Sequence, residues 1–359
     1  MRRLLLILAV LPVLLLPVAS AGAATVHYPR GFFGVMVNGP MDDLSVDLAA
    51  QAQTMRSAGV SAWRVEFAWD QIEPAEGTFQ WGPTDRKVLA AAGAGIPILG
   101  LALRTPTWAN GGNANPFTVP SDPALFGGYL KALIGRYGPR GTLWSEHPGV
   151  PRLPVRWWEM WNEPNIPIYF IGTGGNWASR YAQFVRAVYP AIKEADPGAT
   201  AVLASMANYS WRDLATVLRV PGPRLRFDVA GSHPFSGRPS NVVKIVRLTR
   251  QALDRRGYRQ VPMWLTELTW SSAFGKKTPL TQNWEVTEAG QASRLTEAYR
   301  LFYRARRALR LQRIFWYTWA AHEQTNNSFE YSGLWAMPDG EQPRAKPAFF
   351  AFRRLATGR

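Results

Sequence analysis

The chain has 359 residues, enough for two average domains or for one large α/β barrel. Hydrophobic residues make up 47% of it and charged residues 18%, a balance that excludes a wholly disordered chain. The formal net charge is +16, which would suit an anionic partner. The absence of cysteine excludes disulfide scaffolds and thiolate metal sites, and the four histidines lack metal-ligand spacing, so we expect no metal site.

The first residues have the pattern of an export signal. Two arginines precede an apolar run at residues 4–18, which is short for a membrane span and contains two prolines. Small residues at positions 19–23 fit a cleavage site. We therefore expect a signal peptide at residues 1–23 and a secreted, extracellular protein, with an uncleaved membrane anchor as the alternative. No later apolar run is long enough to span a bilayer, so we expect no stable membrane insertion.

Short apolar segments alternate with helical patterns along the rest of the chain. The predicted strands are residues 32–37, 60–67, 96–103, 155–161, 199–206, 227–232, 261–267 and 313–319. The predicted helices are residues 47–58, 85–94, 121–137, 177–195, 211–218, 241–256, 287–311 and 348–355. Each strand is apolar on both faces, which is typical of parallel strands buried on both sides.

This alternation is compatible with a doubly wound sheet or with a closed (β/α)₈ barrel. A doubly wound nucleotide fold would need a glycine-rich phosphate turn after its first strand. The first predicted strand is instead followed by Asn38-Gly39-Pro40-Met41, which has no such motif. We therefore predict an α/β fold in which residues 24–359 form one (β/α)₈ TIM barrel domain.

Two glutamates stand out because each lies at the end of a predicted strand. Glu163 follows the fourth strand, and Glu267 ends the seventh. These strands face each other across the mouth of a barrel, where this fold carries its catalytic groups. A facing pair of carboxylates is what glycoside cleavage requires, one to protonate the leaving oxygen and one to attack or to activate water. The alternative for either glutamate alone is a buried salt bridge, for example with Arg64.

Several short motifs occur in one order along the chain. They are Ala62-Trp63-Arg64-Val65, Trp69-Asp70-Gln71-Ile72-Glu73-Pro74, Thr105-Pro106-Thr107-Trp108, Trp161-Asn162-Glu163-Pro164, Leu265-Thr266-Glu267 and Gly333-Leu334-Trp335 with Lys346-Pro347-Ala348. The set resembles clan A of the glycoside hydrolases, in particular families 39 and 5. It spans nearly all of the chain after the signal, so the resemblance rests on more than one tetrapeptide.

The resemblance implies roles for four polar residues. Glu163 would be the general acid/base and Glu267 the nucleophile of a retaining enzyme, with their carboxyl groups about 5–5.5 Å apart. Asn162 would hold the 2-hydroxyl of the sugar, and Arg64 would hydrogen-bond Glu267 and keep it ionised. The alternative for Arg64 is a structural ion pair with Glu66 or Glu159. Regular alternation puts Asn162 and Glu163 on opposite faces, so we expect the strand to bulge or turn there.

The resemblance also implies residues that line the sugar site. His233 would lie beside it, with a structural histidine as the alternative, and Trp319, more than Trp316, would form the floor on which the sugar stacks. Trp108 and Trp69 would extend the cleft, with core packing as the alternative for either. One feature departs from the family pattern: the segment after the sixth strand is His233-Pro234-Phe235, where many members have a tyrosine that touches the nucleophile. Either Tyr317 or Asn208 fills that role, or Glu267 is tuned differently.

The sequence therefore predicts a secreted, retaining glycosidase that cleaves β-linked O-glycosidic bonds in a polysaccharide or oligosaccharide. We expect a monomer that binds a carbohydrate substrate, uses no cofactor and binds no nucleic acid. The alternatives are a non-catalytic carbohydrate-binding barrel and a basic protein that binds anionic polysaccharide. The densest arginine group, at residues 300–313, has helical spacing and is interpreted as a solvated helix face.

Overall fold

The computed structural model describes residues 27–276, 278, 283–324 and 327–359. The signal peptide expected at residues 1–23 lies outside these ranges. Within the ranges, no helix has the length and the apolar character needed to cross a membrane.

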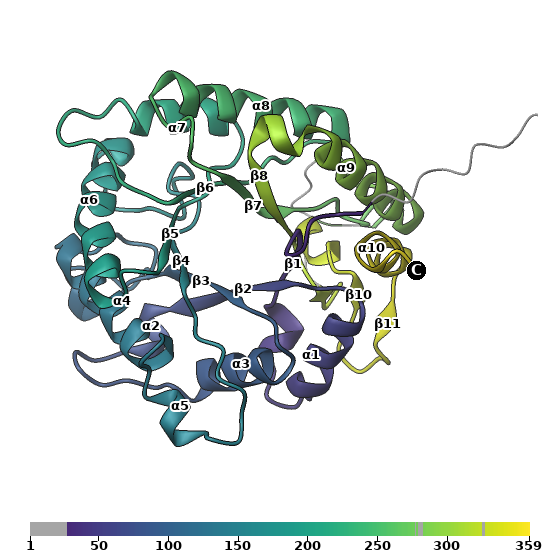
Figure 1. Cartoon of the computed structure of the whole chain (residues 1–359), viewed down its shortest axis with the longest axis horizontal. Helices are drawn as coiled ribbons and strands as arrows, with labels where there is room; N and C mark the ends of the chain where they lie inside the picture. Colours follow the sequence, from purple (N-terminus) through teal and green to yellow (C-terminus); the bar gives the residue numbers. More distant parts are fainter. Residues whose placement is uncertain (1–26, 277, 279–282, 325–326) are drawn as a thin grey trace, which may run out of the picture.

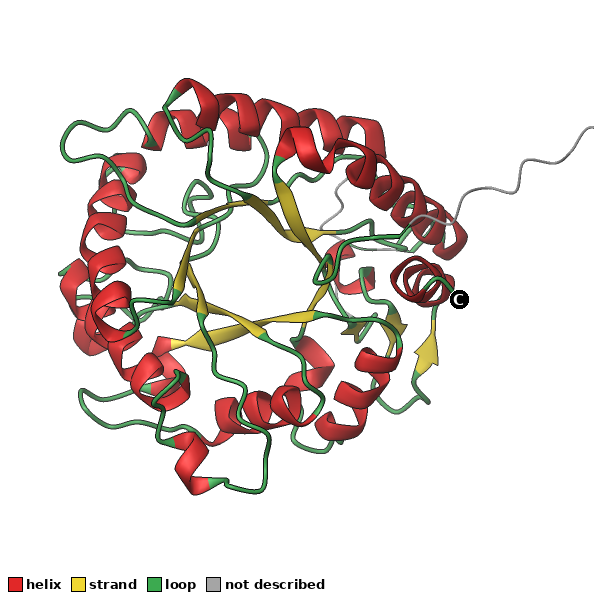
Figure 2. Ribbon diagram, viewed as in Figure 1, coloured by secondary structure: helices red, strands yellow, loops and turns green. Residues whose placement is uncertain are grey.

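Eight parallel strands form a closed barrel in chain order, with the last strand paired to the first. They are β1 (Phe33–Met36), β2 (Ala62–Ala68), β3 (Ile98–Leu103), β4 (Trp157–Met160), β5 (Thr200–Leu203), β6 (Val229–Ser232), β7 (Met263–Leu268) and β8 (Leu311–Trp316). Each overlaps one predicted strand, so the predicted (β/α)₈ barrel is confirmed. Figure 2 shows the strands as an inner ring enclosed by helices.

Helices surround the barrel and run back antiparallel to its strands (Figure 1). The long ones are α1 (Leu48–Ser57), α3 (Gly82–Gly93), α4 (Pro123–Tyr137), α6 (Trp177–Ala195), α7 (Ser210–Val217), α8 (Pro239–Arg255), α9 (Glu288–Leu309) and α10 (Pro347–Thr357). The short ones are η1 (Gly39–Asp42), α2 (Trp69–Ile72), η2 (Thr107–Ala109), α5 (Leu143–Glu146) and η3 (Ser328–Tyr331). A small sheet of β9 (Ala320–Ala321), β10 (Trp335–Ala336) and β11 (Arg344–Ala345) follows the barrel.

The strands are buried on both faces, which explains their apolar sequences. Their outward side chains form the large core beneath the helices. A separate cluster, contributed by six strands, fills the inside of the barrel and consists of Ala62, Leu99, Val202, Val229, Trp264 and Phe315. Gly34 makes room for it, because a Cβ atom there would lie 2.4 Å from the Phe315 ring. The barrel floor is therefore solid, and the polar side chains lie above it.

Charge is distributed unevenly between the two ends of the barrel. Among the described residues, the segments leading from strands to the long helices carry thirteen carboxylates and five basic side chains. The carboxylates are Asp42, Asp43, Asp47, Asp70, Glu73, Glu76, Asp122, Glu163, Glu285, Glu323, Glu330, Asp339 and Glu341, against Arg104, Arg238, Lys276, Arg344 and Lys346.

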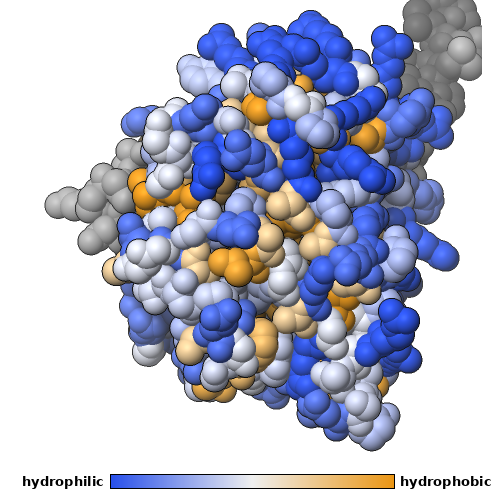
Figure 3. Space-filling view, turned by 90° about the vertical axis from the view of Figure 1, so that its left-hand side faces the viewer, coloured by the Kyte–Doolittle hydropathy of each residue, from blue (hydrophilic) through white to orange (hydrophobic). Residues whose placement is uncertain are grey.

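At the opposite end, the described segments that lead into the strands carry mainly arginine. These are Arg30, Arg140, Arg152, Arg156, Arg219, Arg224, Arg226, Arg256, Arg259 and Arg310, against Glu146, Asp196 and Asp228. Of the two ends of the barrel, the one where the strands begin is therefore basic and the one where they end is acidic. Viewed from the side, hydrophilic residues cover much of the surface, with smaller groups of hydrophobic residues between them (Figure 3).

Candidate active site

A cavity of about 220 Å³ opens where the barrel strands end. Its polar lining combines carboxylates with amides, one arginine and two tyrosines, and its apolar lining is mainly phenylalanine and leucine. The lining residues are Met36, Asn38, Arg64, Glu66, Leu101, Leu103, Phe117, Asn162, Glu163, Tyr169, Phe235, Glu267, Tyr317, Asn327, Phe329 and Glu330. The cavity therefore presents several acids to a molecule that enters it.

Glu163 and Asn162 reach this cavity because the chain leaves the regular strand directly after β4. Trp161 has φ 81° and Glu163 has φ 42°, so the strand alternation is broken at both positions. The Trp161 ring is fully buried, and its indole NH donates to the carbonyl of Tyr169 at 2.6 Å. The turn expected at this point is present, and both side chains line the cavity.

Glu267 reaches the cavity through a second irregularity. The pairing of β7 with β8 changes register between Leu265 and Leu268. Thr266 and Glu267 are neighbours, yet Thr266 bonds to Glu159 inside the barrel and Glu267 lines the cavity. The disturbed register thus brings two consecutive side chains to the interior, where a regular strand would present only one.

The two glutamates converge on His233, which follows β6. One oxygen of Glu163, one oxygen of Glu267 and one ring nitrogen of His233 all lie within 4.8 Å of one another. Three such atoms could in principle hold a cation. All three side chains already have partners, however: Nδ1 of His233 lies 2.7 Å from Glu163 Oε1, and Arg64 Nη1 donates to Glu267 Oε1 at 2.6 Å. A cation at this place would have to compete with Arg64.

Arg64 is the centre of the hydrogen bonds beneath the cavity. Its fully buried guanidinium donates to Glu267, to Glu159 Oε2 at 2.7 Å and to Asn162 Oδ1 at 2.9 Å. Burial by itself lowers the pKa of Arg64, but the charges of Glu159 and Glu267 raise it above the ordinary arginine value. Arg64 therefore stays charged and holds Glu267, as the sequence predicted, and also Asn162, which was not predicted as its partner.

A second chain of hydrogen bonds leads from His233 back to Arg64. His233 Nε2 lies 2.9 Å from the hydroxyl of Thr266, which donates to Glu159 Oε1 at 2.8 Å. Ser205 supports the same carboxylate with its hydroxyl at 3.2 Å. Because the Thr266 hydrogen is directed to Glu159, its oxygen is free to accept from Nε2–H of His233. The His233 ring therefore connects Glu163, at Nδ1, with Thr266, at Nε2.

Burial sets the proton affinity of Glu267. Desolvation raises the pKa of this carboxyl above the ordinary glutamate value, His233 and Arg64 oppose the rise, and the negative charge of Glu163 adds to it. The charge on Glu267 thus depends on the charge of Glu163, as expected for two close carboxylates.

Five residues expected near the sugar lie outside the cavity lining. His233 is fully buried and reaches the site through its hydrogen bond with Glu163. Trp319 is fully buried, and its indole NH donates to Gln51 at 3.0 Å, so its face is not available for stacking. Trp69 is also fully buried and packs edge-on against Trp108. Trp108 donates to the backbone of Glu73. Asn208 is exposed and does not line the cavity.

The position expected for Trp319 is taken by Tyr317. The strand predicted to run to residue 319 ends at Trp316, so the next residue, Tyr317, is the one that lines the cavity. Burial raises its pKa, and the charge of Glu267 raises it further, which places the phenol near that carboxylate. Tyr317 is also the hydroxyl that the sequence offered in place of the tyrosine missing after His233, and Phe235 lines the cavity without one.

The sequence named Glu66 and Glu159 only as alternative partners of Arg64, and the structure pairs Arg64 with Glu159. Thr266 and Glu330 were not singled out. Glu66 lies two residues after Arg64 on β2, so strand alternation could have placed it on the same face. Glu159 lies within β4 and Thr266 within β7, so strand alternation could likewise have placed both on the inner face of the barrel. Glu330 comes from η3, in the long segment after β8, where no local pattern indicates its direction. Arg104 lies 3.6 Å from Glu66, whose pKa is raised by burial and lowered by that arginine.

Comparison with known proteins places these features in a wider group. Residues 45–111 match the family model described as glycoside hydrolase family 42, β-galactosidase, which belongs to clan A. Over 81 residues, the chain is 32% identical to endo-1,4-β-xylanase A of Fusarium oxysporum and 31% identical to endo-1,4-β-xylanase 1 of Gibberella zeae. These matches cover 21% of this chain and 24% and 22% of the two xylanases, so it spans about a quarter of their length.

Similar solved structures cover far more of the chain. A family 39 glycoside hydrolase from Bacteroides cellulosilyticus has a TM-score of 0.63, 19% identity, and coverage of 90% of this chain and 63% of its own. A monomeric β-xylosidase from Caulobacter crescentus has a TM-score of 0.64 and 19% identity, and the match covers 92% of this chain and 69% of the xylosidase. A family 5 glycoside hydrolase from Bifidobacterium longum has a TM-score of 0.64 and 15% identity, and the match covers 91% of this chain and 78% of the hydrolase. The chain resembles clan A glycoside hydrolases in fold over most of its length and in sequence over a shorter segment.

Proposed function

We propose that this protein is a secreted, retaining glycoside hydrolase that cleaves β-linked O-glycosidic bonds. Glu163 acts as general acid/base and Glu267 as nucleophile. The observation that carries the proposal is the convergence of these two carboxylates, from opposite strands of the barrel, to within 4.8 Å at their nearest oxygens in one cavity. Retaining glycosidases have carboxyl groups about 5–5.5 Å apart, whereas inverting ones leave about 6.5–9.5 Å for a water molecule.

In the first step, the carboxylate of Glu267 attacks the anomeric carbon and forms an ester with it. The glycosidic bond breaks, and Glu163 gives its proton to the leaving oxygen. Arg64 positions Glu267 for attack, and its 2.9 Å bond to Asn162 Oδ1 leaves the amide NH₂ of that side chain to hold a sugar hydroxyl.

In the second step, water replaces the sugar on Glu267. Glu163, now ionised, takes a proton from the water as the oxygen bonds to the anomeric carbon, and Glu267 is released. His233 lies 2.7 Å from Glu163 in a fully buried position, so it orients the carboxyl that serves as acid and then as base. The reaction needs no metal or organic cofactor, because the two carboxylates carry every proton and bond involved.

The acidic lining of the cavity narrows the class of sugar. Glu66, Glu163, Glu267 and Glu330 all face it, and Arg64 is already bonded to Glu159 and Glu267. A uronic acid would meet like charges there, so we infer a neutral sugar at the site of cleavage. The similar proteins include xylanases, a xylosidase and a β-galactosidase family, which makes β-xylosides and β-galactosides the first substrates to examine.

The experiment is a screen of aryl β-glycosides and β-linked polysaccharides with the wild-type protein, Glu267→Gln and Glu76→Gln. Glu76 is an exposed glutamate outside the cavity and serves as the matched control. We expect hydrolysis by the wild type and the control and its loss in Glu267→Gln. Carbohydrate binding without hydrolysis by any of the three would instead identify a non-catalytic binding barrel.

A further inference from the structure

The barrel end opposite the cavity bears a groove lined by arginine. Two adjoining hollows of about 610 Å³ and 590 Å³ share Pro29, Arg30 and Arg313, and together they form this groove. Its six arginines are Arg30, Arg56, Arg306, Arg307, Arg310 and Arg313. No aspartate or glutamate is among the described residues that line either hollow.

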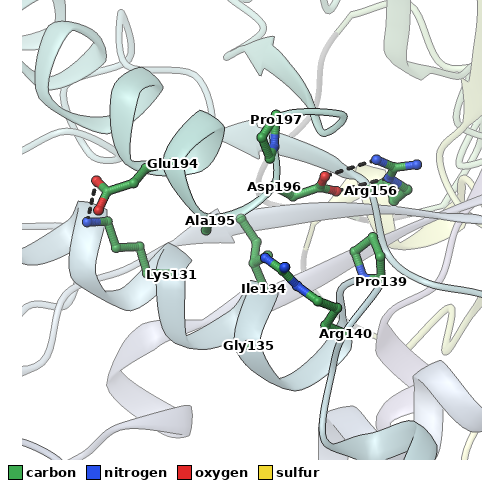
Figure 4. Close-up of a pocket in the computed structure, with 10 residues that line it drawn as sticks. All are labelled: Lys131, Ile134, Gly135, Pro139, Arg140, Arg156, Glu194, Ala195, Asp196 and Pro197. Carbon is green, nitrogen blue, oxygen red and sulfur yellow. Dashed lines mark hydrogen bonds and ion pairs between the residues drawn. The ribbon is translucent and has the colours of Figure 1, made fainter.

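The charges of this groove lack anionic partners within the described part of the chain. None of its six arginines forms an ion pair there, although the same end of the barrel contains carboxylates that pair elsewhere. Figure 4 shows the contrast in another hollow of similar size, where Glu194 pairs with Lys131 and Asp196 pairs with Arg156. The arginine groove thus has a positive charge that the protein itself leaves uncompensated.

Arg313 makes the groove more than an exposed charged surface. This half-buried guanidinium lies 4.1 Å from the Trp157 ring and 5.1 Å from the Trp264 ring, and it donates to the carbonyl of Gly31 at 2.8 Å. Its Nε atom is buried without a hydrogen-bond partner. Burial lowers the pKa of Arg313 to about 10, because no carboxylate offsets the desolvation. An anion in the groove would supply that missing charge.

Favourable interaction with helix dipoles accounts for only part of this cluster. Arg306 and Arg307 lie in the last turn of α9, Arg310 is its C-cap and Arg56 lies in the last turn of α1, where positive charge stabilises a helix. Arg30 precedes β1 and Arg313 lies within β8, so neither gains from a helix end. Three separate stretches of the chain, at residues 30, 56 and 306–313, therefore contribute arginine to one groove.

We propose that the arginine groove binds a linear anionic polysaccharide carrying sulfate or phosphate groups. The planar guanidinium matches such groups with two parallel hydrogen bonds, which lysine cannot provide. The groove runs across two hollows, so it suits an extended chain. A flat lipid surface would not reach the recessed Arg313, and the rings of Trp157 and Tyr303 are covered by Arg313 and Arg306, which leaves them unavailable for stacking nucleic-acid bases.

The two ends of the barrel then have separate tasks. The acidic end surrounds the cavity and repels a polyanion, while the basic end holds it. A protein bound in this way would turn its cavity away from the polymer and toward other glycans. This inference is independent of the proposed hydrolase activity, because the groove and the cavity share no lining residue among those described.

The test measures binding of fluorescently labelled heparin oligosaccharide by fluorescence anisotropy over a series of salt concentrations. The variant is Arg307→Gln with Arg310→Asn, because asparagine tolerates the left-handed conformation of residue 310, φ 51°. The matched control is Lys244→Gln with Arg247→Gln, which removes two exposed charges from α8 outside the groove. Circular dichroism checks that both variants are folded.

We expect the groove variant to bind about tenfold more weakly and to lower the salt slope by about two, while the control binds as the wild type does. Hydrolysis of a small aryl glycoside should be the same in all three proteins. Equal weakening in both variants would show diffuse charge attraction and overturn the proposal. Absence of heparin binding, or tighter binding to duplex DNA or to phosphatidylglycerol vesicles, would overturn it as well.

Discussion

Arg64 and Glu159 form an ion pair at 2.7 Å in which both side chains are fully buried. From this pair, one hydrogen bond leads directly to Glu267, and a path through Thr266 and His233 leads to Glu163. The two carboxylates that face the cavity are therefore connected beneath it by a continuous set of buried polar groups. Such a network positions both side chains only if every member keeps its partner.

The buried pair makes a prediction about stability. Arg64→Met should lower the free energy of unfolding by about 3–5 kcal/mol, because it leaves Glu159 and Glu267 without their counterion. Adding Glu159→Met should restore part of the loss, since one of the two unpaired carboxylates is then removed. Urea denaturation of both variants measures this. A double variant less stable than Arg64→Met would contradict the assignment.

Thr266→Val tests the path between His233 and Glu159. The substitution keeps the shape of the side chain and removes one hydrogen-bond acceptor and one donor. We expect kcat to fall about three- to tenfold with little change in KM, the equivalent of one neutral hydrogen bond. Steady-state kinetics on one aryl glycoside decides it. Thr269→Val, a buried threonine hydroxyl without a partner, is the control and should retain full activity.

Glu163→Gln should separate substrates by their leaving groups. General acid catalysis is worth about 10²–10⁴-fold, so hydrolysis of substrates with poor leaving groups should fall by that factor. Substrates with activated phenol leaving groups need little protonation and should lose less in the first step. Pre-steady-state measurement of that step compares the two kinds. Equal losses for both would exclude the acid role of Glu163.

The raised pKa of Glu267 predicts the acidic side of the pH profile. Attack requires the ionised form, so kcat/KM should fall as the pH drops through a value above that of an ordinary glutamate, about 4.3. As the general acid, Glu163 must carry its proton while Glu267 ionises, so Glu163→Gln should leave the acidic limb in place on an activated substrate. A clear shift of that limb to lower pH would show that Glu163 is ionised there and would contradict its role as the acid.

The short carboxylate separation predicts the stereochemical outcome. Glu267 must attack the anomeric carbon itself, because no water fits between the two side chains, and two inversions give net retention. Proton NMR of the first product from a β-linked substrate, recorded before mutarotation, should show the β-anomer. An initial α-anomer would identify an inverting enzyme in which Glu267 acts as a base.

The amino-acid sequence by itself determined the barrel and the two facing glutamates. Both follow from local patterns: short strands buried on both faces alternate with helices, and Glu163 and Glu267 each lie at a strand end. Arg64 was also accessible to sequence reasoning, because an arginine in an apolar strand needs an anionic partner. These features depend on neighbouring residues in the chain, so no tertiary contact is needed to recognise them.

Only the tertiary structure decided which other side chains face the cavity. Trp319 was expected there, but β8 ends at Trp316 and the chain turns, so Tyr317 lines the cavity and Trp319 packs beneath α1 against Gln51. Periodicity defines the faces of a strand but not the residue at which it ends. The link from His233 through Thr266 to Glu159 joins three separate strands or strand ends, and the uncompensated arginine groove joins three stretches, at residues 30, 56 and 306–313. Both exist only because barrel closure brings these distant segments together.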